Sequence, residues 1–383
     1  MNQQSHIKLI SGQYSGPAAV FLRFLLAAAA RSYSIAIALR NFLYSKGWLK
    51  TYRANAVVIS IGNITVGGTG KTPLVIWLCN TISQISELKS QNYKCAILTR
   101  GYKAIKNYKM KTRKYEDEPV ILARSCPLAK VIMNPDRVAG AEEAINKFGA
   151  NVLVMDDGFQ HRRLARDLDI VTIDCTRPFG YGKLLPAGLL REPVASLSRA
   201  ETIVLTRCDK VSQAELAAVE EKLKSVNPNI VIARSIHAPV CAKSLGQKEI
   251  GLEELKNKKI FAFCGIGNPQ AFLSTIEKMG LNLVGSEIYN DHHHYTDNDI
   301  TDIYEQACYL GVDLILTTQK DWTKTALLTP QTVNLPGSDQ STVKRNILFA
   351  YLVVELKFVA GEDKLTDLIE QALAGRIYGK PKQ

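Results

Sequence analysis

A glycine-rich segment containing one lysine follows an apolar run near residue 60. The run is AVVISI at 56–61, and GNITVGGTGKTP occupies 62–73. A strand, a glycine-rich turn and a helix start are the setting of a phosphate-binding loop, where backbone amides and the helix N-terminus surround phosphate oxygens. The residues expected to bind a nucleotide are Thr65, Val66, Gly67, Gly68, Thr69, Gly70, Lys71 and Thr72.

Two side chains complete the chemistry of this loop. Lys71 can reach a terminal phosphate, and the Thr72 hydroxyl can hold Mg²⁺. The usual pattern starts with glycine where this chain has Thr65. The alternative interpretation is therefore a glycine-rich turn with a chance Lys-Thr pair. Pro73 is compatible with the first turn of a helix. The segment predicts a protein that handles a nucleoside triphosphate.

Two adjacent carboxylates follow a second apolar run, VLVM at 152–155. Asp156 and Asp157 would end a buried strand, where such enzymes hold Mg²⁺ or its waters. The alternative is a turn before a glycine. Gln160 and His161 come next, and His161 could contact phosphate or be an exposed turn residue.

Two further clusters leave several interpretations open. The acids Glu116, Asp117 and Glu118 end a basic segment; they are either solvated charge or include a base that takes a proton from an attacking hydroxyl. The run DHHHYT at 291–296 could bind metal, lie on the surface, or present an Asp-His pair to a nucleotide from a second domain.

Composition limits the class of protein. The chain has 383 residues, 46% of them hydrophobic and 22% charged, which is typical of a globular protein with a large core. Its net charge of +12 favours an anionic partner. The sequence lacks the interleaved basic and aromatic residues that are typical of nucleic-acid binding. The eight cysteines form no C-x-x-C pair and read as reduced thiols.

Residues 17–39 are mostly apolar but contain Arg23 and Arg31. A spanning helix needs about 20 apolar residues, and each central arginine costs roughly 2.5–3.5 kcal/mol on insertion scales. A helix in the membrane interface fits better, since arginines can reach lipid headgroups. A buried core helix and a spanning helix remain alternatives.

Alternating strands and helices predict an α/β fold with a parallel, P-loop NTPase-like sheet covered by helices on both faces. A second, smaller α/β domain is expected beyond it, with strands that include 230–235 and 347–354. The expected divisions are a membrane-associated helical region at 1–50, a P-loop domain at 51–225, and a second domain with a closing helix at 226–383. In such sheets ligands bind at the carboxyl ends of strands.

These motifs together resemble the tetraacyldisaccharide 4′-kinase family, the lipid A 4′-kinases of Gram-negative bacteria. The resemblance extends in order from about residue 55 to 325. The matching segments are 62–73, 99–102 (TRGY), 117–119 (DEP), 136–137 (DR), 156–161 (DDGFQH), 185–188 (LPAG), 190–193 (LREP), 291–296 (DHHHYT) and 317–321 (TTQKD).

The resemblance implies transfer of the ATP γ-phosphate to the 4′-hydroxyl of a tetraacylated glucosamine disaccharide 1-phosphate, at the cytoplasmic face of the inner membrane. ATP and Mg²⁺ would be the cofactors, and no obligate protein partner is implied. The implied roles are phosphate binding by Lys71, metal support by Thr72, Asp156, Asp157 and Glu192, base catalysis by Asp117 with His292, and polar active-site contacts by Arg137, Gln160 and His161.

Two other classes compete with this interpretation. A membrane-associated ATPase switch would share the G-G-x-G-K-T loop, but those proteins carry lysine where this chain has Val66. A GTP-binding module would need a base-reading motif, which Thr206-Arg207-Cys208-Asp209 resembles only loosely.

Overall fold

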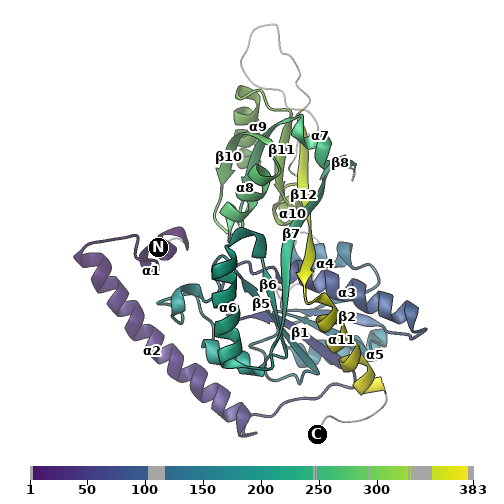
Figure 1. Cartoon of the computed structure of the whole chain (residues 1–383). Coiled ribbons are helices and arrows are strands. Elements are labelled where there is room, and N and C mark those ends of the chain that lie inside the picture. The colour runs from purple at the N-terminus through teal and green to yellow at the C-terminus, as the bar shows by residue number, and fades with distance from the viewer. Residues whose placement is uncertain are drawn as a thin grey trace. The chain divides into compact units, whose positions relative to one another are not determined.

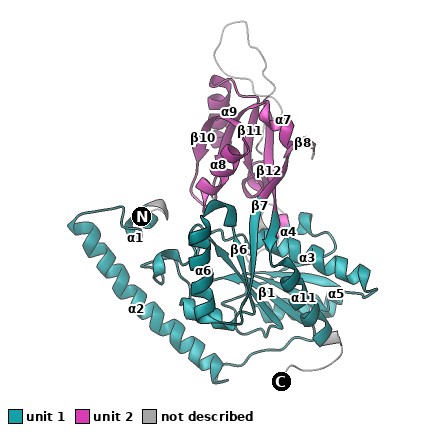
Figure 2. Ribbon diagram, in the orientation of Figure 1, with its two compact units in different colours: residues 1–110, 122–237, 356–383 teal, residues 111–121, 238–355 magenta. Residues whose placement is uncertain are grey.

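The computed structural model describes residues 3–101, 117–244, 246, 248–291, 293–326, 328 and 347–377. The chain divides into two compact units: residues 1–110, 122–237 and 356–383 form unit 1, and residues 111–121 and 238–355 form unit 2 (Figure 2). This division differs from the boundaries expected from the sequence. The closing helix at the C-terminus belongs to unit 1, because two long strands carry the chain into unit 2 and back.

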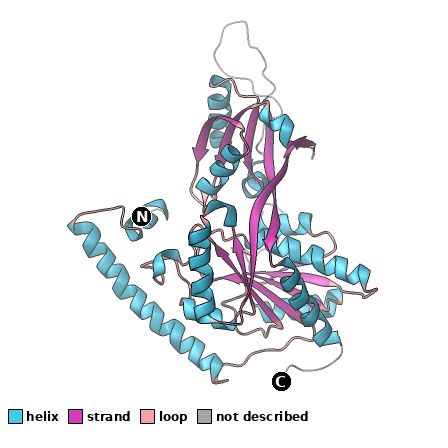
Figure 3. Cartoon of the chain, in the orientation of Figure 1, coloured by secondary structure: helices cyan, strands magenta, loops and turns pink. Residues whose placement is uncertain are grey.

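Unit 1 is built on a parallel sheet in the order β7-β6-β5-β1-β4-β2-β3. Helices lie against the strands of this sheet (Figure 3). The strands are β1 (Val57–Asn63), β2 (Cys95–Thr99), β3 (Lys130–Met133), β4 (Val152–Asp156), β5 (Leu168–Asp174), β6 (Thr202–Thr206) and β7 (Val231–Ser244). The helices are α3 (Lys71–Leu88), α5 (Arg137–Phe148), α6 (Gln213–Val226) and α11 (Glu362–Ile377). A further helix, α4 (Asp117–Ser125), begins in unit 2 and ends in unit 1.

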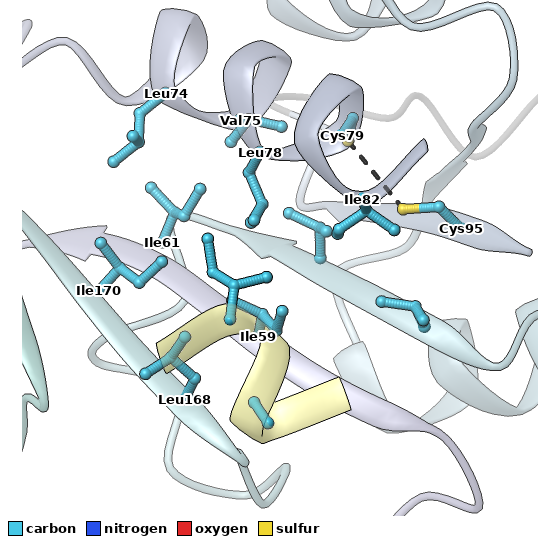
Figure 4. Packing of buried hydrophobic residues seen from close by; sticks show 14 of the residues in the cluster. Ile59, Ile61, Leu74, Val75, Leu78, Cys79, Ile82, Cys95, Leu168 and Ile170 are labelled. Carbon is cyan, nitrogen blue, oxygen red and sulfur yellow. Dashed lines mark hydrogen bonds between the residues drawn. The ribbon is translucent and has the colours of Figure 1, made fainter. Parts of the chain in front are cut away.

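One face of this sheet packs against α3 and α11. Ile59 and Ile61 of β1 point to the same face because side chains alternate along a strand. They meet Leu74 and Leu78 of α3 in a fully buried cluster (Figure 4). Leu365 and other apolar residues of α11 join the same cluster. This packing fixes α3, and with it the loop that begins the helix, against the centre of the sheet.

The opposite face packs against α5 and α6. Val58 of β1 and Leu153 of β4 contact the cluster that contains Ala141 of α5. Val171 of β5 lies in the cluster that contains Leu216 of α6. Helices therefore cover both faces, and the predicted α/β fold with a parallel sheet is confirmed.

Unit 2 is a smaller α/β unit. Its strands lie in the order β10-β9-β11-β12-β7, with β8 antiparallel to β7. Clusters on its two faces contain residues of α8 and of α9. Its remaining elements are β8 (Glu249–Gly251), α7 (Leu252–Lys256), β9 (Lys259–Cys264), α8 (Pro269–Lys278), β10 (Asn282–Ile288), α9 (Asp297–Tyr309), β11 (Leu314–Thr318), α10 (Gln319–Thr325) and β12 (Leu348–Ala360).

The chain begins with α1 (Gln3–Ile10) and the long helix α2 (Pro17–Ser45) (Figure 1). Among the described residues, α2 is the one helix long and apolar enough to cross a membrane. Large apolar side chains remain exposed along it, including Phe21 (64%), Phe24 (69%) and Ile35 (69%). Ile37 is its one buried residue in the described part of the chain. A core helix would bury its apolar stripe, so the buried-core alternative does not describe α2.

Candidate active site

The glycine-rich segment forms a loop between β1 and α3. β1 ends at Asn63, and α3 begins at Lys71 with Gly70 as its N-cap in a left-handed conformation (φ 87°). A Cβ at position 70 would lie 2.9 Å from Nε2 of His237 and 3.1 Å from Cγ2 of Thr206. Glycine is therefore required at 70 by both conformation and space.

Buried polar side chains of β1 and β5 form hydrogen bonds that fix this loop. The side-chain amide of Asn63 donates to Oγ1 of Thr69 (2.9 Å), and that hydroxyl lies 2.8 Å from the hydroxyl of Thr172 on β5. The amide of Val66 donates to the Leu189 carbonyl (2.8 Å). The backbone amides of 67–70 have no hydrogen-bond acceptor within the described part of the chain. Such amides at a helix N-terminus are suited to phosphate oxygens.

A three-residue ion-pair cluster lies beside the start of α3. Lys71 Nζ is 3.3 Å from Oδ1 of Asp157, the residue directly after β4. Nη1 of Arg191 contacts both carboxylate oxygens of Asp157, at 3.0 and 2.8 Å. The structure thus brings together the loop lysine and one of the two predicted acids, and it adds Arg191 to them.

Asp157 is ionised in this cluster. Burial opposes its ionisation, but the charges of Lys71 and Arg191 outweigh burial and lower its pKa to about 2. Its backbone has φ 54°, an uncommon conformation for a residue other than glycine. Backbone strain of this kind is tolerated where the surrounding structure holds the residue in place. Asp157 is therefore a fixed negative charge next to the phosphate-binding loop.

The other predicted polar residues surround the end of β4. Asp156 is buried, and the Thr99 hydroxyl lies 3.5 Å from its carboxylate. Arg137, the first residue of α5, donates to the Asp156 carbonyl (3.0 Å). Gln160 donates to the carbonyl of Asn63 at the end of β1 (2.8 Å). Gln160 therefore ties the turn after β4 to the start of the loop.

His161 is neutral at physiological pH. Burial and the nearby Arg137 and Arg166 lower its pKa to about 4. Its Nε2 atom is buried and has no hydrogen-bond partner among the described residues. His161 can thus serve a substrate as a neutral donor or acceptor, and not as the cation that a simple phosphate contact would use.

Glu192 lies in a different set of contacts from Lys71 and Asp157. It is 0% exposed, and its carboxylate contacts Arg40 (3.1 Å), Asn41 (3.1 Å) and Arg199 (3.0 Å). Burial opposes its ionisation, but Arg199, Asn41 and Arg40 outweigh burial and hold the pKa of Glu192 below its usual range. Its observed contacts are those of an anchor for α2, which carries Arg40 and Asn41.

Glu192→Gln is expected to destabilise the protein by about 1–3 kcal/mol, because it leaves two half-buried arginines without their counter-charge. The matched control is Glu143→Gln, which removes an exposed pair with Lys147 one helical turn away and should cost about 0.5 kcal/mol or less. Thermal unfolding of both variants measures the difference. Equal unfolding midpoints, with weaker metal dependence of activity in Glu192→Gln, would contradict the anchor and favour the metal role.

The predicted residues of unit 2 are resolved in part. His292 and the Asp117 side chain lie outside what the structure describes. Asp291 lies 3.5 Å from Lys320, and His293 lies 3.3 Å from Asp299 while stacking on Tyr289. Among the described side chains, no group of three His, Cys, Asp or Glu residues is arranged to hold a metal ion.

Three residues near the loop escaped the sequence interpretation. Arg191 was included only as part of the matching segment 190–193, and no role was predicted for it, although it contacts Asp157. Thr206 and Arg207 were weighed only as a base-reading motif, and the structure turns both toward the loop: Thr206 donates to the Thr69 carbonyl (3.0 Å), and Arg207 to the Gly68 carbonyl (2.9 Å). These contacts join residues more than 130 positions apart, so no local pattern signals them.

A parallel sheet with a glycine-rich loop between its first strand and the following helix, and with a lysine opening that helix, defines a P-loop protein of the α/β class. A model of the family described as Tetraacyldisaccharide-1-P 4'-kinase matches residues 22–374. The chain belongs to the tetraacyldisaccharide 4′-kinase family, and it is a kinase of lipid A biosynthesis. The resemblance is thereby confirmed, and the ATPase-switch and GTP-binding alternatives fall away.

Relatives match along most of the chain. The tetraacyldisaccharide 4′-kinase of Syntrophus aciditrophicus is 37% identical and aligns with 85% of this chain and 90% of its own length. That of Anaeromyxobacter sp. strain K is 33% identical, with 96% and 95% aligned. A crystal structure of the apo form of LpxK from Aquifex aeolicus in complex with ATP superposes with a TM-score of 0.65 and 26% identity, covering 92% of this chain and 99% of that one.

Proposed function

We propose that this kinase transfers the γ-phosphate of ATP to the 4′-hydroxyl of a tetraacylated glucosamine disaccharide 1-phosphate, with Mg²⁺, at the cytoplasmic face of the inner membrane. The acceptor is the one named for the family, and the solved relative binds ATP. The net charge of +12 suits a substrate that carries phosphate and lies in an anionic membrane.

One observation carries the proposal. Arg191 contacts Asp157 beside the phosphate-binding loop through its side chain, and its carbonyl accepts a hydrogen bond from Tyr33 of α2 (2.9 Å). Tyr33, Arg40 and Asn41 lie on one face of α2, since they are spaced by seven and eight residues. That face is held by the 191–192 segment, while Phe24 and other apolar side chains are exposed. An apolar helix is thus fastened to the residue that supports the donor site.

The donor side of the site rests on Lys71, Thr72 and the acids after β4. Lys71 and the amides of the loop would bind the phosphates. Mg²⁺ commonly takes one or two carboxylates and a hydroxyl beside the nucleotide phosphates, so Thr72, Asp156 and ionised Asp157 are a suitable donor set without a cluster of three acids. Glu192 would support this set only indirectly, through Arg191. When bound, Mg²⁺ offsets negative charge on the phosphates.

The acceptor side rests on Asp117, the first residue of α4. Its carboxylate would take the proton of the 4′-hydroxyl while the acceptor oxygen bonds to the γ-phosphorus and the bond to ADP breaks. His292 would assist Asp117. Arg137, Gln160 and His161 would contribute polar contacts around the reacting groups.

The expected result is transfer of ³²P from γ-labelled ATP to a lipid disaccharide 1-phosphate in detergent micelles, measured by chromatography of the lipid. An acceptor whose 4′-position already carries phosphate is the matched control, and it should remain unlabelled. ATP hydrolysis without a labelled lipid would contradict the proposal and return the protein to the switch class.

A further inference from the structure

Two consecutive residues at the end of β6 bind two consecutive carbonyls of the phosphate-binding loop. The Thr206 hydroxyl donates to the carbonyl of Thr69 (3.0 Å), and Nη1 of Arg207 donates to the carbonyl of Gly68 (2.9 Å). Thr206 is 0% exposed and Arg207 is 9% exposed. The contacts are therefore made inside the protein, where a hydrogen bond to a fixed partner restricts motion more than at the surface.

Arg207 is itself held by two constraints. Its Nη1 also pairs with the buried carboxylate of Asp174, the last residue of β5. Its backbone has φ 56°, a conformation that bulky residues adopt only where their surroundings demand it. Asp174 in turn accepts hydrogen bonds from the amide and hydroxyl of Thr176. The guanidinium thus has one fixed position, between the end of β5 and the loop.

Holding these carbonyls also sets the direction of two amides. In a trans peptide unit the carbonyl oxygen and the following N–H point in opposite directions. Fixing the Gly68 carbonyl therefore orients the N–H of Thr69, and fixing the Thr69 carbonyl orients the N–H of Gly70. Both amides lack an acceptor within the described residues. They are thus held ready for an anion, with no side chain of the loop competing for them.

We propose that Thr206 and Arg207 are positioning residues that preorganise the amides of Thr69 and Gly70 for the phosphates of the nucleotide. Asp174 orients Arg207 for this role. Arg207 occupies the place where a base-reading motif would carry lysine, and its guanidinium is committed to the loop and to Asp174. The proposal rests on the proposed function in that the ligand is ATP. It adds a support for phosphate binding that acts through the backbone.

Arg207→Ala is expected to weaken ATP binding about 10- to 100-fold, because a hydrogen bond from a charged donor contributes about 1.5–3 kcal/mol. Thr206→Val, which keeps shape and removes only the hydroxyl, should weaken it about fivefold. The Michaelis constant for the lipid acceptor should change less than twofold in both variants. The matched control is Arg234→Ala, which removes an arginine–carboxylate pair between β7 and Glu220 of α6 (2.6 Å) and should leave ATP affinity unchanged.

ATP affinity is measured by titration calorimetry on the full-length protein in detergent, with thermal unfolding recorded for each variant. Thr206→Val decides the matter if Arg207→Ala does not fold. ATP affinity within twofold of wild type in Thr206→Val, or equal losses for the two substrates, would overturn the proposal. Wild-type protein that binds ATP but labels no lipid would contradict the proposed function and leave this inference standing.

Discussion

Replacing Lys71 with alanine is expected to lower kcat/KM by about 10²–10³-fold, the loss typical of removing one preorganised group that stabilises developing charge. Lys71 opens α3 directly after the loop, and its ammonium lies 3.3 Å from Asp157. In the structure this pair neutralises both charges. Phosphate oxygens would compete for the same ammonium, so the substitution removes a cation needed by the donor and leaves Asp157 to Arg191 alone.

The label-transfer assay measures this loss. Lys89→Ala is the matched control, because Lys89 caps the other end of the same helix and pairs with exposed Glu370 (2.7 Å). Its activity should stay within twofold of wild type. Lys71→Arg keeps the charge but changes its shape and hydrogen-bonding geometry, and it should recover only part of the activity. Activity of Lys71→Ala comparable to that of the Lys89 variant would remove Lys71 from the reaction.

The sheet of unit 1 was predictable because its signals are local. The apolar runs at 56–61 and 152–155 are each long enough for a buried strand, and the structure places β1 and β4 there side by side. The helix α6 carried a readable signal that the sequence interpretation passed over. Ser212 and Glu215 form a capping box before Leu216, Val219 and Leu223, spaced three and four residues apart.

The crossing strands were less predictable. β7 was expected at 230–235, but it continues to Ser244 through Pro239. In its second half, Cys241 pairs with Gly251 of β8, and the local sequence does not predict this pairing. β12 likewise continues to Ala360, beyond the expected end at 354. Which compact unit receives the last helix depends on this extension, so the sequence favoured a simpler division.

The site residues could likewise be predicted only where their signals are local. Lys71, Asp156 and Asp157 stand beside apolar strands, and chain order is enough to suggest that they converge. The partners that hold them come from far away: Arg191 is 34 residues from Asp157, and Arg207 is 139 residues from Gly68. Arginine in a loop has many possible partners, and only the folded chain selects one. Glu192 illustrates the consequence, because an acid expected near metal lies between Arg40 and Arg199.

Asp117→Ala is expected to lower kcat by about 10²–10⁴-fold if Asp117 is the general base, while ATP affinity stays near that of wild type. The reason is that the residue would act on the acceptor hydroxyl and not on the donor phosphates. Asp117→Asn keeps the shape and removes the basic oxygen, so its loss should be as large.

The neighbouring acids make this prediction sharp. Glu116 and Glu118 carry the same charge beside Asp117, so a loss caused by general electrostatics would appear in all three neutral variants. A base must reach one proton in one geometry, so Glu116→Gln and Glu118→Gln should each change kcat less than threefold. His292→Asn should lower kcat by a smaller factor than Asp117→Ala, since it would act through Asp117. If kcat fell mainly in the variant of one glutamate while Asp117→Asn stayed active, that glutamate would be the base instead of Asp117.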